Sequence, residues 1–353
     1  MRRSDSSDGL RAWIDIENPP QVQYLVPLVR EFERRGAEVL VTARDYGMTF
    51  DLLRERGLDF TPVGRHFGPR KRAKVVGTAR RIRDLRALLR SSARPSLVLS
   101  ASRSASLAAR SLRIPSFAVC DYEYVNLFAF RLAAACVVHP EVIPEETFRN
   151  RGIAPERLLS FRGIKEDITF ADVDFDGVQA HVLPRGARPG TLNVLVRPPA
   201  EESHYHRDTS SALGRRAIEL LAADETLTVI YSPRYEWQVA MLSAIEWRAS
   251  LVVLDEAVPF ASLLKAVDVV LSGGGTMVRE AAYLGIPAIS LFQGYVGEVD
   301  KHLARVGRLA IVRSVSDLAA VDLHRLQRRS PFAENPHAAE EVVDAVIRVA
   351  RAA

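Results

Sequence analysis

The stretch LSGGGTMVREAAYLGIPAISLF, residues 271–292, carries the pattern that decides the fold. It continues an apolar strand (DVVLS, 268–272), passes three glycines and enters a helical pattern that ends at Gly285. A second apolar run, PAISLF (287–292), follows directly. Strand, helix and strand in this order predict two parallel strands whose connecting helix covers the sheet.

The same alternation runs along the whole chain. We predict strands near 12–16, 38–42, 96–100, 116–120 and 136–139 in the first half, and near 192–196, 227–231, 251–254, 268–272 and 287–292 in the second. Amphipathic helical stretches separate them. The pattern predicts an α/β protein with two doubly wound, Rossmann-like domains that face a central cleft. In such sheets ligands bind at the carboxyl ends of the strands.

Changes in composition predict the domain boundaries. We expect residues 1–10 to form a disordered tail, residues 11–168 the N-terminal, acceptor-side domain, and residues 169–190 a linker rich in Gly, Pro and Asp. Residues 191–330 form the C-terminal domain, and residues 331–353 a terminal helix that we expect to pack back on the N-terminal domain.

The composition narrows the class of protein. Of 353 residues, 48% are hydrophobic and 26% charged, which is typical of a soluble globular chain. We find no apolar run long enough for a membrane span and no signal peptide. Cys120 and Cys136 lie in apolar runs and fit a reducing cytoplasm. The net charge of +5 is too small to indicate a nucleic-acid partner.

The three glycines allow two interpretations. Gly273, Gly274 and Gly275 follow a strand and precede a helix, so they form either a tight turn that needs glycine's conformational freedom or a backbone cradle for a phosphate. Glu280 favours the cradle, because it lies one to two helical turns further on, where a carboxylate would accept the hydroxyls of a ribose. We therefore predict a nucleotide site formed by Ser272, Gly273, Gly274, Gly275, Thr276 and Glu280.

A basic loop follows the first strand of the second half. Arg197, His204, Tyr205 and His206 supply a guanidinium, two imidazoles and a phenol after one strand. These groups suit further phosphate contacts or a proton donor, although isolated surface histidines are usually inert.

Polar side chains also follow three strands of the first half. Glu17, Asn18, Gln21 and Gln23 follow the first strand, and Ser102 and Arg103 follow strand 96–100. Asp121 and Glu123 follow strand 116–120; we predict that Asp121 caps the next helix and that Glu123 is the better candidate for a general base. The first loop alone is equally compatible with a helix-entry turn.

Two further segments attract attention. Residues 68–90 combine basic side chains with Val75, Val76, Ala79, Ile82, Leu85 and Leu89 at helical spacing. This pattern favours a solvated helix with one core face over a cationic surface for an anionic acceptor or a lipid. The run DVDFD (172–176) resembles a metal loop but lies in the predicted linker, so we predict neither a metal nor another cofactor.

Several motifs together resemble the domain of unknown function 354 family. They are WIDIENPPQVQYLVPLVREFERRGAEVLVTARD (13–45), DYEY (121–124), RGIKE (162–166), RPPAEESHYH (197–206) and SGGGTMVREAAYLGIPAIS (272–290). The resemblance covers nearly all of residues 11–350. It implies a GT-B-type fold, similar to the UDP-GlcNAc transferase of peptidoglycan synthesis and to non-hydrolysing UDP-GlcNAc 2-epimerases.

The resemblance also implies roles for individual residues. It assigns the diphosphate and ribose to the glycines and Glu280, and it implicates Gln293 and Glu298 in contacts with the donor sugar. It further implies a histidine in the first loop, where this chain has Gln21. A glutamine can bind a sugar hydroxyl but cannot act as a base.

Three hypotheses follow. The first is a metal-independent glycosyltransferase that uses a nucleotide-diphosphate sugar, most simply a UDP-sugar, and a hydroxyl acceptor that is free or lipid-linked. In it Glu123, Glu17, His204 and His206 are the candidate catalytic residues, and the protein is cytoplasmic or peripheral at the inner membrane face. The second is a sugar-nucleotide 2-epimerase, and the third a non-catalytic nucleotide-sugar binder. The sequence does not distinguish the base, the sugar, the acceptor or the oligomeric state.

Overall fold

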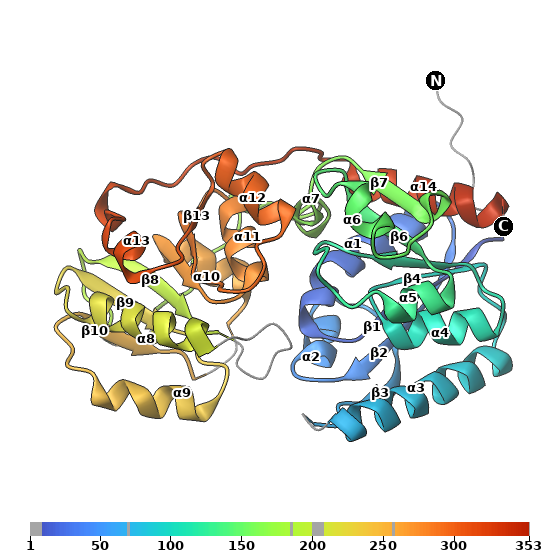
Figure 1. The fold of residues 1–353 in the computed structure, drawn as a ribbon, viewed down its shortest axis with the longest axis horizontal. Helices are drawn as coiled ribbons and strands as arrows, with labels where there is room; N and C mark the ends of the chain where they lie inside the picture. Colours follow the sequence, from blue (N-terminus) through green and yellow to red (C-terminus); the bar gives the residue numbers. More distant parts are fainter. Residues whose placement is uncertain (1–8, 69–70, 184–185, 200–207, 256–257, 353) are drawn as a thin grey trace. The chain divides into compact units, whose positions relative to one another are not determined.

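A computed structural model describes residues 9–68, 71–183, 186–199, 208–255 and 258–352. The chain divides into two compact units, one made of Met1–Asp172 with Ala333–Ala353 and the other of Val173–Phe332. Both are built from parallel strands with helices between them (Figure 1). The predicted pair of doubly wound, Rossmann-like α/β domains is confirmed.

The first unit contains a seven-stranded parallel sheet in the order β3-β2-β1-β4-β5-β6-β7. Its strands are β1 Arg11–Ile16, β2 Glu38–Asp45, β3 Thr61–Arg65, β4 Leu97–Ser100, β5 Ser116–Val119, β6 Cys136–Pro140 and β7 Leu158–Phe161. Its helices are α1 Pro19–Arg34, α2 Thr49–Glu55, α3 Lys71–Ser91, α4 Arg103–Ser111, α5 Phe128–Ala133, α6 Glu145–Arg149, α7 Lys165–Thr169 and α14 Ala338–Ala352.

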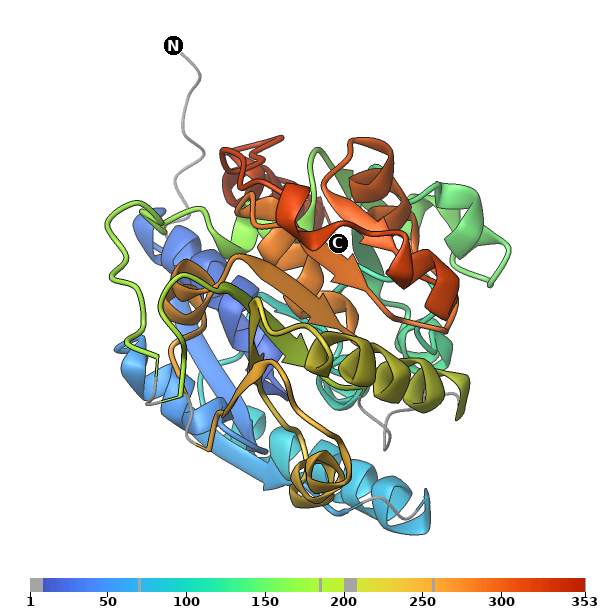
Figure 2. The same ribbon diagram turned by 90° about the vertical axis from the view of Figure 1, so that its left-hand side faces the viewer.

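The second unit contains a six-stranded parallel sheet in the order β10-β9-β8-β11-β12-β13. Figure 2 shows the same ribbon turned so that this unit faces the viewer. Its strands are β8 Leu192–Arg197, β9 Leu227–Tyr231, β10 Ser250–Val253, β11 Val269–Ser272, β12 Ala288–Ser290 and β13 Leu309–Ile311. Its helices are α8 Asp208–Ala222, α9 Glu236–Ala240, α10 Phe260–Ala266, α11 Gly275–Tyr283, α12 Glu298–Arg305 and α13 Val315–Ala319.

The two sheets share one topology. In each, the chain builds outward from a central strand in one direction and then crosses over to build in the other. The crossover lies between β1 and β4 in the first unit and between β8 and β11 in the second. Such a crossover is where doubly wound folds bind ligands, because the loops that leave the two central strands diverge there.

Apolar side chains cover both faces of the first sheet. One core is formed by α1, α14 and the strands, with Leu25, Phe32 and Val343 fully buried. The other lies under α3 and α4 and contains Trp13 and Leu85. Burial on both faces explains why the strands are apolar throughout rather than alternating.

The chain returns to the first unit after leaving it. The Asp167 carboxylate accepts hydrogen bonds from the backbone N–H groups of Ile164 (2.8 Å), Glu334 (3.0 Å) and Asn335 (3.3 Å). Beyond this anchor, α14 packs against α1, α7 and β7. These three hydrogen bonds to one buried carboxylate hold the returning chain at residues 334–335, where no helix or strand does so.

Most of the segment 169–190 belongs to the second unit. The boundary between the units falls after Asp172. Phe175 is buried, with the Lys265 ammonium 4.9 Å from its ring centre, and the His181 N–H donates to the Ser262 carbonyl at 2.9 Å. Phe175 and His181, which lie in a stretch without helical or strand periodicity, therefore contact this unit.

The helix predicted in residues 68–90 is only partly a core helix. Leu85 and Leu89 are buried and Ile82 packs against them. By contrast, Val75 and Val76 are 70% and 64% exposed. The expectation that all these apolar residues form one core face is therefore wrong for the first turns of α3.

Among the residues that the structure describes, no helix is long and apolar enough to cross a membrane.

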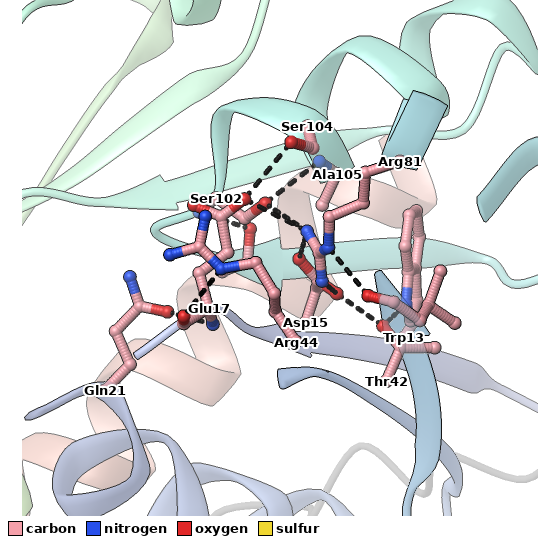
Figure 3. A network of polar contacts seen from close by, with 12 residues as sticks. Trp13, Asp15, Glu17, Gln21, Thr42, Arg44, Arg81, Ser102, Ser104 and Ala105 are labelled. Atoms are coloured by element: carbon pink, nitrogen blue, oxygen red, sulfur yellow. Dashed lines mark hydrogen bonds and ion pairs between the residues drawn. The ribbon is translucent and has the colours of Figure 1, made fainter. Parts of the chain in front are cut away.

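Arg81 of α3 ties this helix to the centre of the first sheet (Figure 3). Its guanidinium donates to both Asp15 oxygens (2.9 and 2.7 Å), to Glu17 Oε1 (3.0 Å) and to Ser102 Oγ (3.1 Å). The Arg81 and Asp15 side chains are 2% and 0% exposed. A charge this deeply buried is tolerable only when paired and hydrogen-bonded, as here.

Replacing Arg81 should therefore destabilise the first unit strongly. Arg81→Gln leaves Asp15 buried without its cation, and we expect the free energy of unfolding to fall by about 3–5 kcal/mol. Urea unfolding followed by Trp13 fluorescence, with Trp237 and Trp247 replaced by Phe, reads this unit alone. Arg83→Gln, on the exposed face of the same helix, should change it by less than about 0.5 kcal/mol. Equal midpoints for the two variants would contradict the assignment.

Candidate functional site

The glycine loop lies at the crossover of the second sheet. Strands β8 and β11 are hydrogen-bonded neighbours, and Ser272 is in register with Arg197. Directly beyond them the Gly273 N–H donates to the Arg197 carbonyl at 3.1 Å. Helix α11 then begins at Gly275, with Gly274 as its N-cap.

The three glycines do not adopt the conformation that only glycine favours. None of them has a positive φ, and Gly274 is extended at φ −126° and ψ 151°. Gly273 is required for space instead, because a Cβ atom there would lie 2.6 Å from Pro199 Cγ and 2.9 Å from Pro199 Cα. The tight-turn interpretation requires a positive φ that only glycine adopts readily, and none of the three glycines has one, so that interpretation is wrong.

The open backbone donors lie one residue further on than predicted. The Gly273 N–H is bonded to Arg197, and the Gly274 N–H donates to Ser272 Oγ at 3.1 Å. The N–H groups of Gly275, Thr276 and Met277 occupy the first turn, where a helix cannot bond them internally. Among the described residues no side chain caps them. The donors available to an anion are these three, while Ser272 and Gly273 shape the loop.

Three arginines surround this helix start. The Arg197 guanidinium donates to Ser232 Oγ (2.6 Å) and to the carbonyls of Ser232 (3.1 Å) and Pro233 (2.8 Å). Arg234 Nη2 lies 3.0 Å from the position of a Cβ on Gly274, and Arg279 Nη2 lies 3.4 Å from that of a Cβ on Gly275. Arg279 also pairs with Asp300 at 2.6 Å.

The electrostatics of this cluster favour an anion. Burial, together with repulsion from Arg234, lowers the pKa of Arg197 to about 10, so its cation persists at neutral pH but is destabilised. The partial positive charge at the start of α11 adds to the same field. A phosphate placed at these amides would relieve both effects.

Sequence reasoning missed Arg234 and Arg279. Arg234 follows β9, in the sequence YSPRYEW (231–237), so it satisfies the same strand-end criterion as Arg197. It was overlooked because no cluster of polar residues accompanies it. Arg279 was not predicted as a site residue because it lies inside an amphipathic helix, where an arginine side chain is usually solvated.

Other predicted residues of the second unit have defined places. Glu280 is 5% exposed on α11. Gln293 is buried after β12, and its Nε2 donates to the carbonyls of Leu291 and Val312, both at 3.3 Å. Glu298 begins α12 and pairs with Lys301 at 2.6 Å. His204, Tyr205 and His206 lie outside the described residues.

The predicted residues of the first loop are held by the protein itself. Glu17 pairs with Arg81 and also accepts from Ser104 Oγ at 3.1 Å. Gln21 Oε1 accepts from the Glu17 N–H at 2.7 Å, and Asn18 caps α1. These contacts account for the loop without a ligand.

The remaining predicted residues of this unit are structural or exposed. Ser102 caps α4 by accepting from the Ala105 N–H at 3.0 Å. Gln23 accepts from Arg56 at 2.6 Å, and Arg103 is exposed on α4. The structure does not gather these three side chains into one cluster.

A second polar cluster lies after β5 and β7. Lys165 is 4% exposed in its side chain, and its Nζ lies 3.0 Å from Asp121 Oδ2 and 3.3 Å from Glu166 Oε1. The Glu166 side chain is fully buried. Glu123 lies in the loop after β5 and is 1% exposed. Two carboxylates and one ammonium thus meet at the carboxyl edge of the first sheet.

The predicted capping role of Asp121 is wrong. Helix α5 begins only at Phe128, whose N–H donates to Asn126 Oδ1 at 2.9 Å. Asp121 lies seven residues earlier and pairs with Lys165 instead. The pair was not predicted, because Lys165 follows β7, an edge strand absent from the prediction.

Comparison with known proteins places the chain in a family. The model of the protein family of unknown function DUF354 matches residues 10–348, and the chain belongs to this family. An uncharacterised protein of Methanocaldococcus jannaschii is 27% identical over 320 residues, covering 88% of this chain and 90% of that protein.

Solved structures with a similar fold include UDP-GlcNAc 2-epimerases and MurG. The UDP-GlcNAc 2-epimerase of Neisseria meningitidis, solved with UDP-GlcNAc, has a TM-score of 0.73 at 14% identity and covers 96% of this chain and 100% of its own. The S. aureus MnaA structure with UDP has a TM-score of 0.74 at 16% identity and covers 97% of both chains. MurG of Acinetobacter baumannii has a TM-score of 0.54 at 16% identity, covering 96% and 99%. At these identities the likeness establishes the GT-B fold.

The glycine loop offers a matched pair of substitutions. Gly273→Ala forces a Cβ against the Pro199 backbone, and we expect overpacking to cost about 1–3 kcal/mol. Gly274→Ala meets only the mobile end of Arg234, so its cost should stay below about 1 kcal/mol. Thermal unfolding of both variants, followed by circular dichroism, makes the comparison. A Gly273→Ala protein as stable as the Gly274→Ala protein would show that Pro199 does not dictate the glycine.

Proposed function

We propose that this protein binds a nucleotide-diphosphate sugar, a UDP-sugar in particular, at the carboxyl edge of the second sheet. The observation that carries the proposal is the uncapped start of α11 at the crossover between β8 and β11, flanked by Arg197 and Arg234. The diphosphate accepts from the Gly275, Thr276 and Met277 amides. Glu280, further along α11, accepts the ribose hydroxyls. Structures of the same fold that hold UDP-GlcNAc and UDP support the choice of base.

The proposed reaction is transfer of the sugar to a hydroxyl acceptor without a metal ion. Negative charge develops on the departing diphosphate, and preorganised amides with arginines stabilise such charge most when they are already in place. Deprotonation of the acceptor is assigned to Glu123, a carboxylate buried in the loop after β5, because a general base must be a group that can accept a proton. Glu17 is a weaker candidate, because its carboxylate already pairs with Arg81.

A second candidate function is 2-epimerisation of the sugar nucleotide. The observation that favours it is the cluster of the partly exposed Asp121 with the buried Lys165 and Glu166 at the carboxyl edge of the first sheet. An epimerase must remove and return a proton at a sugar carbon, which calls for several acid and base groups together. NMR of the protein with UDP-GlcNAc alone separates the two: a new epimer without acceptor excludes the transferase, and unchanged substrate excludes the epimerase.

The nucleotide proposal predicts one preferred base and two sensitive residues. In calorimetric titrations with UDP, GDP, dTDP and CDP, we expect UDP to bind most tightly. Arg234→Gln and Glu280→Ala should each weaken UDP by at least about tenfold, the cost of a lost charged hydrogen bond. Arg216→Gln, on the exposed face of α8, removes the same charge and should leave the affinity unchanged. If none of the four nucleotides binds, the proposal is wrong.

The acceptor side of the proposal concerns the start of α3. Val75 and Val76 are exposed on a helix that also carries Arg72 and Arg80, a combination suited to an anionic membrane surface and a lipid-linked acceptor. Val75→Ser with Val76→Ser should reduce co-sedimentation with vesicles containing phosphatidylglycerol severalfold. Val182→Ser, at a valine 86% exposed in the second unit, is the control. Equal sedimentation of all three proteins would refute a membrane-binding role.

A further inference from the structure

A second basic pocket lies on the opposite edge of the second sheet. Helix α11 starts at the carboxyl end of β11 and returns to the amino end of β12, and α12 does the same between β12 and β13. Gly285 follows the end of α11 and Gly307 follows the end of α12, and both glycines line a cavity of about 470 Å³. This pocket is therefore distinct from the glycine loop, which lies at the other end of α11.

The charge of this pocket is one-sided. Arg308, Arg325, Arg328 and Arg329 line it, and no acidic residue does. Two of the four are already satisfied: Arg325 pairs with Asp322 at 3.0 Å, and Arg328 donates to the carbonyls of Leu264 (3.0 Å), Lys265 (2.9 Å) and Val267. Among the described residues, neither Arg308 nor Arg329 pairs with a carboxylate, and Arg308 donates to one carbonyl only, so these two guanidinium groups are the best placed for a ligand.

These two guanidinium groups lie close together. Arg308 donates to the Ser330 carbonyl at 2.6 Å and stacks over Phe332, 5.1 Å from its ring centre. Arg329 Nη1 lies 3.5 Å from the position of a Cβ on Gly307, the residue before Arg308. Burial and the charge of Arg329 lower the pKa of Arg308, as expected for two cations that repel each other.

The partial negative charges at the C-terminal ends of α11 and α12 do not balance the positive charges of Arg308 and Arg329. Each helix C-terminus carries about half a negative charge, so α11 and α12 together offset roughly one of the two cations. Part of that is already used, because the Gly285 carbonyl accepts from the Arg329 N–H (2.8 Å) and the Tyr283 carbonyl accepts from the Phe332 N–H (2.6 Å). The two helix ends therefore do not neutralise the arginines that line this concave site.

The backbone around the pocket is fixed. Gly285 has φ +78°, and a Cβ there would lie 2.0 Å from the Arg329 carbonyl oxygen. This close approach seats the chain carrying Arg329 directly on the end of α11. The position of the arginine is thus set by main-chain packing.

We propose that this pocket is a binding site for a small phosphorylated molecule, with its phosphoryl group held between Arg308 and Arg329. Planar guanidinium groups match phosphate oxygens in pairs. The cavity exceeds the size of a phosphate alone and matches the range of ligand pockets. Ile286, Ala288 and Leu309 supply an apolar wall for the rest of the ligand. The site is independent of the nucleotide site.

Calorimetric titration of the full chain with inorganic pyrophosphate tests this site. We expect Arg329→Gln to remove one binding event or weaken it at least about tenfold, and Arg308→Gln to do the same. Arg329 is exposed, so its replacement leaves folding intact even if Arg308→Gln does not fold. Arg234→Gln should spare this event and remove any binding at the glycine loop, so the two sites fail separately.

Three results would overturn the proposal. The first is a pyrophosphate affinity and stoichiometry that Arg329→Gln leaves unchanged. The second is an equal loss in Arg216→Gln, which would show a general charge effect rather than a site. A single-stranded oligonucleotide that binds more tightly than pyrophosphate and depends on Arg329 would likewise replace the small-molecule site with a nucleic-acid surface.

Discussion

The crossover between two central parallel strands is the constraint on which the rest of this protein depends. Parallel strands cannot be joined by a short turn, so each connection must travel back over a face of the sheet. At the crossover the chain changes direction across the sheet, and the two loops that leave β8 and β11 part from one another. The helix that starts there has backbone donors that no strand can satisfy.

The two units differ in how the backbone N–H groups at the start of this helix are hydrogen-bonded. At the start of α4 in the first unit, Ser102 caps the helix, and the Arg81 guanidinium joins Ser102 to Asp15. At the equivalent start of α11 in the second unit, the N-cap is Gly274, which has no side chain to offer. At the first crossover the protein's own side chains hydrogen-bond the helix start. At the second, the helix start has no side-chain cap among the described residues and lies beside Arg234 and Arg279. This chemical asymmetry, on one topology, is the reason we propose the phosphate site in the second unit rather than in the first.

Much of the fold followed from the pattern of apolar residues, and the failures have identifiable causes. The predicted strands are all present, but β3, β7 and β13 were missed. β3, β7 and β13 lie at sheet edges, where burial is less complete, and β3 (TPVGR) includes a proline and a glycine that weaken a strand pattern. Missing β7 also hid Lys165 and Glu166, because a residue is recognised as following a strand only once the strand is known.

The sequence by itself determined the two Rossmann-like sheets, the glycine loop after β11 and the polar positions at strand ends, because strand periodicity and helix boundaries are local properties. Only the tertiary structure decided what these positions do. It places Arg234, from the loop after β9, and Arg279, from within α11, next to the glycines. It shows that the Gly273 and Gly274 N–H groups are already hydrogen-bonded and that Glu17 pairs with Arg81. Those outcomes depend on which strands are neighbours and on distances across the sheet, and the linear order of residues does not fix either.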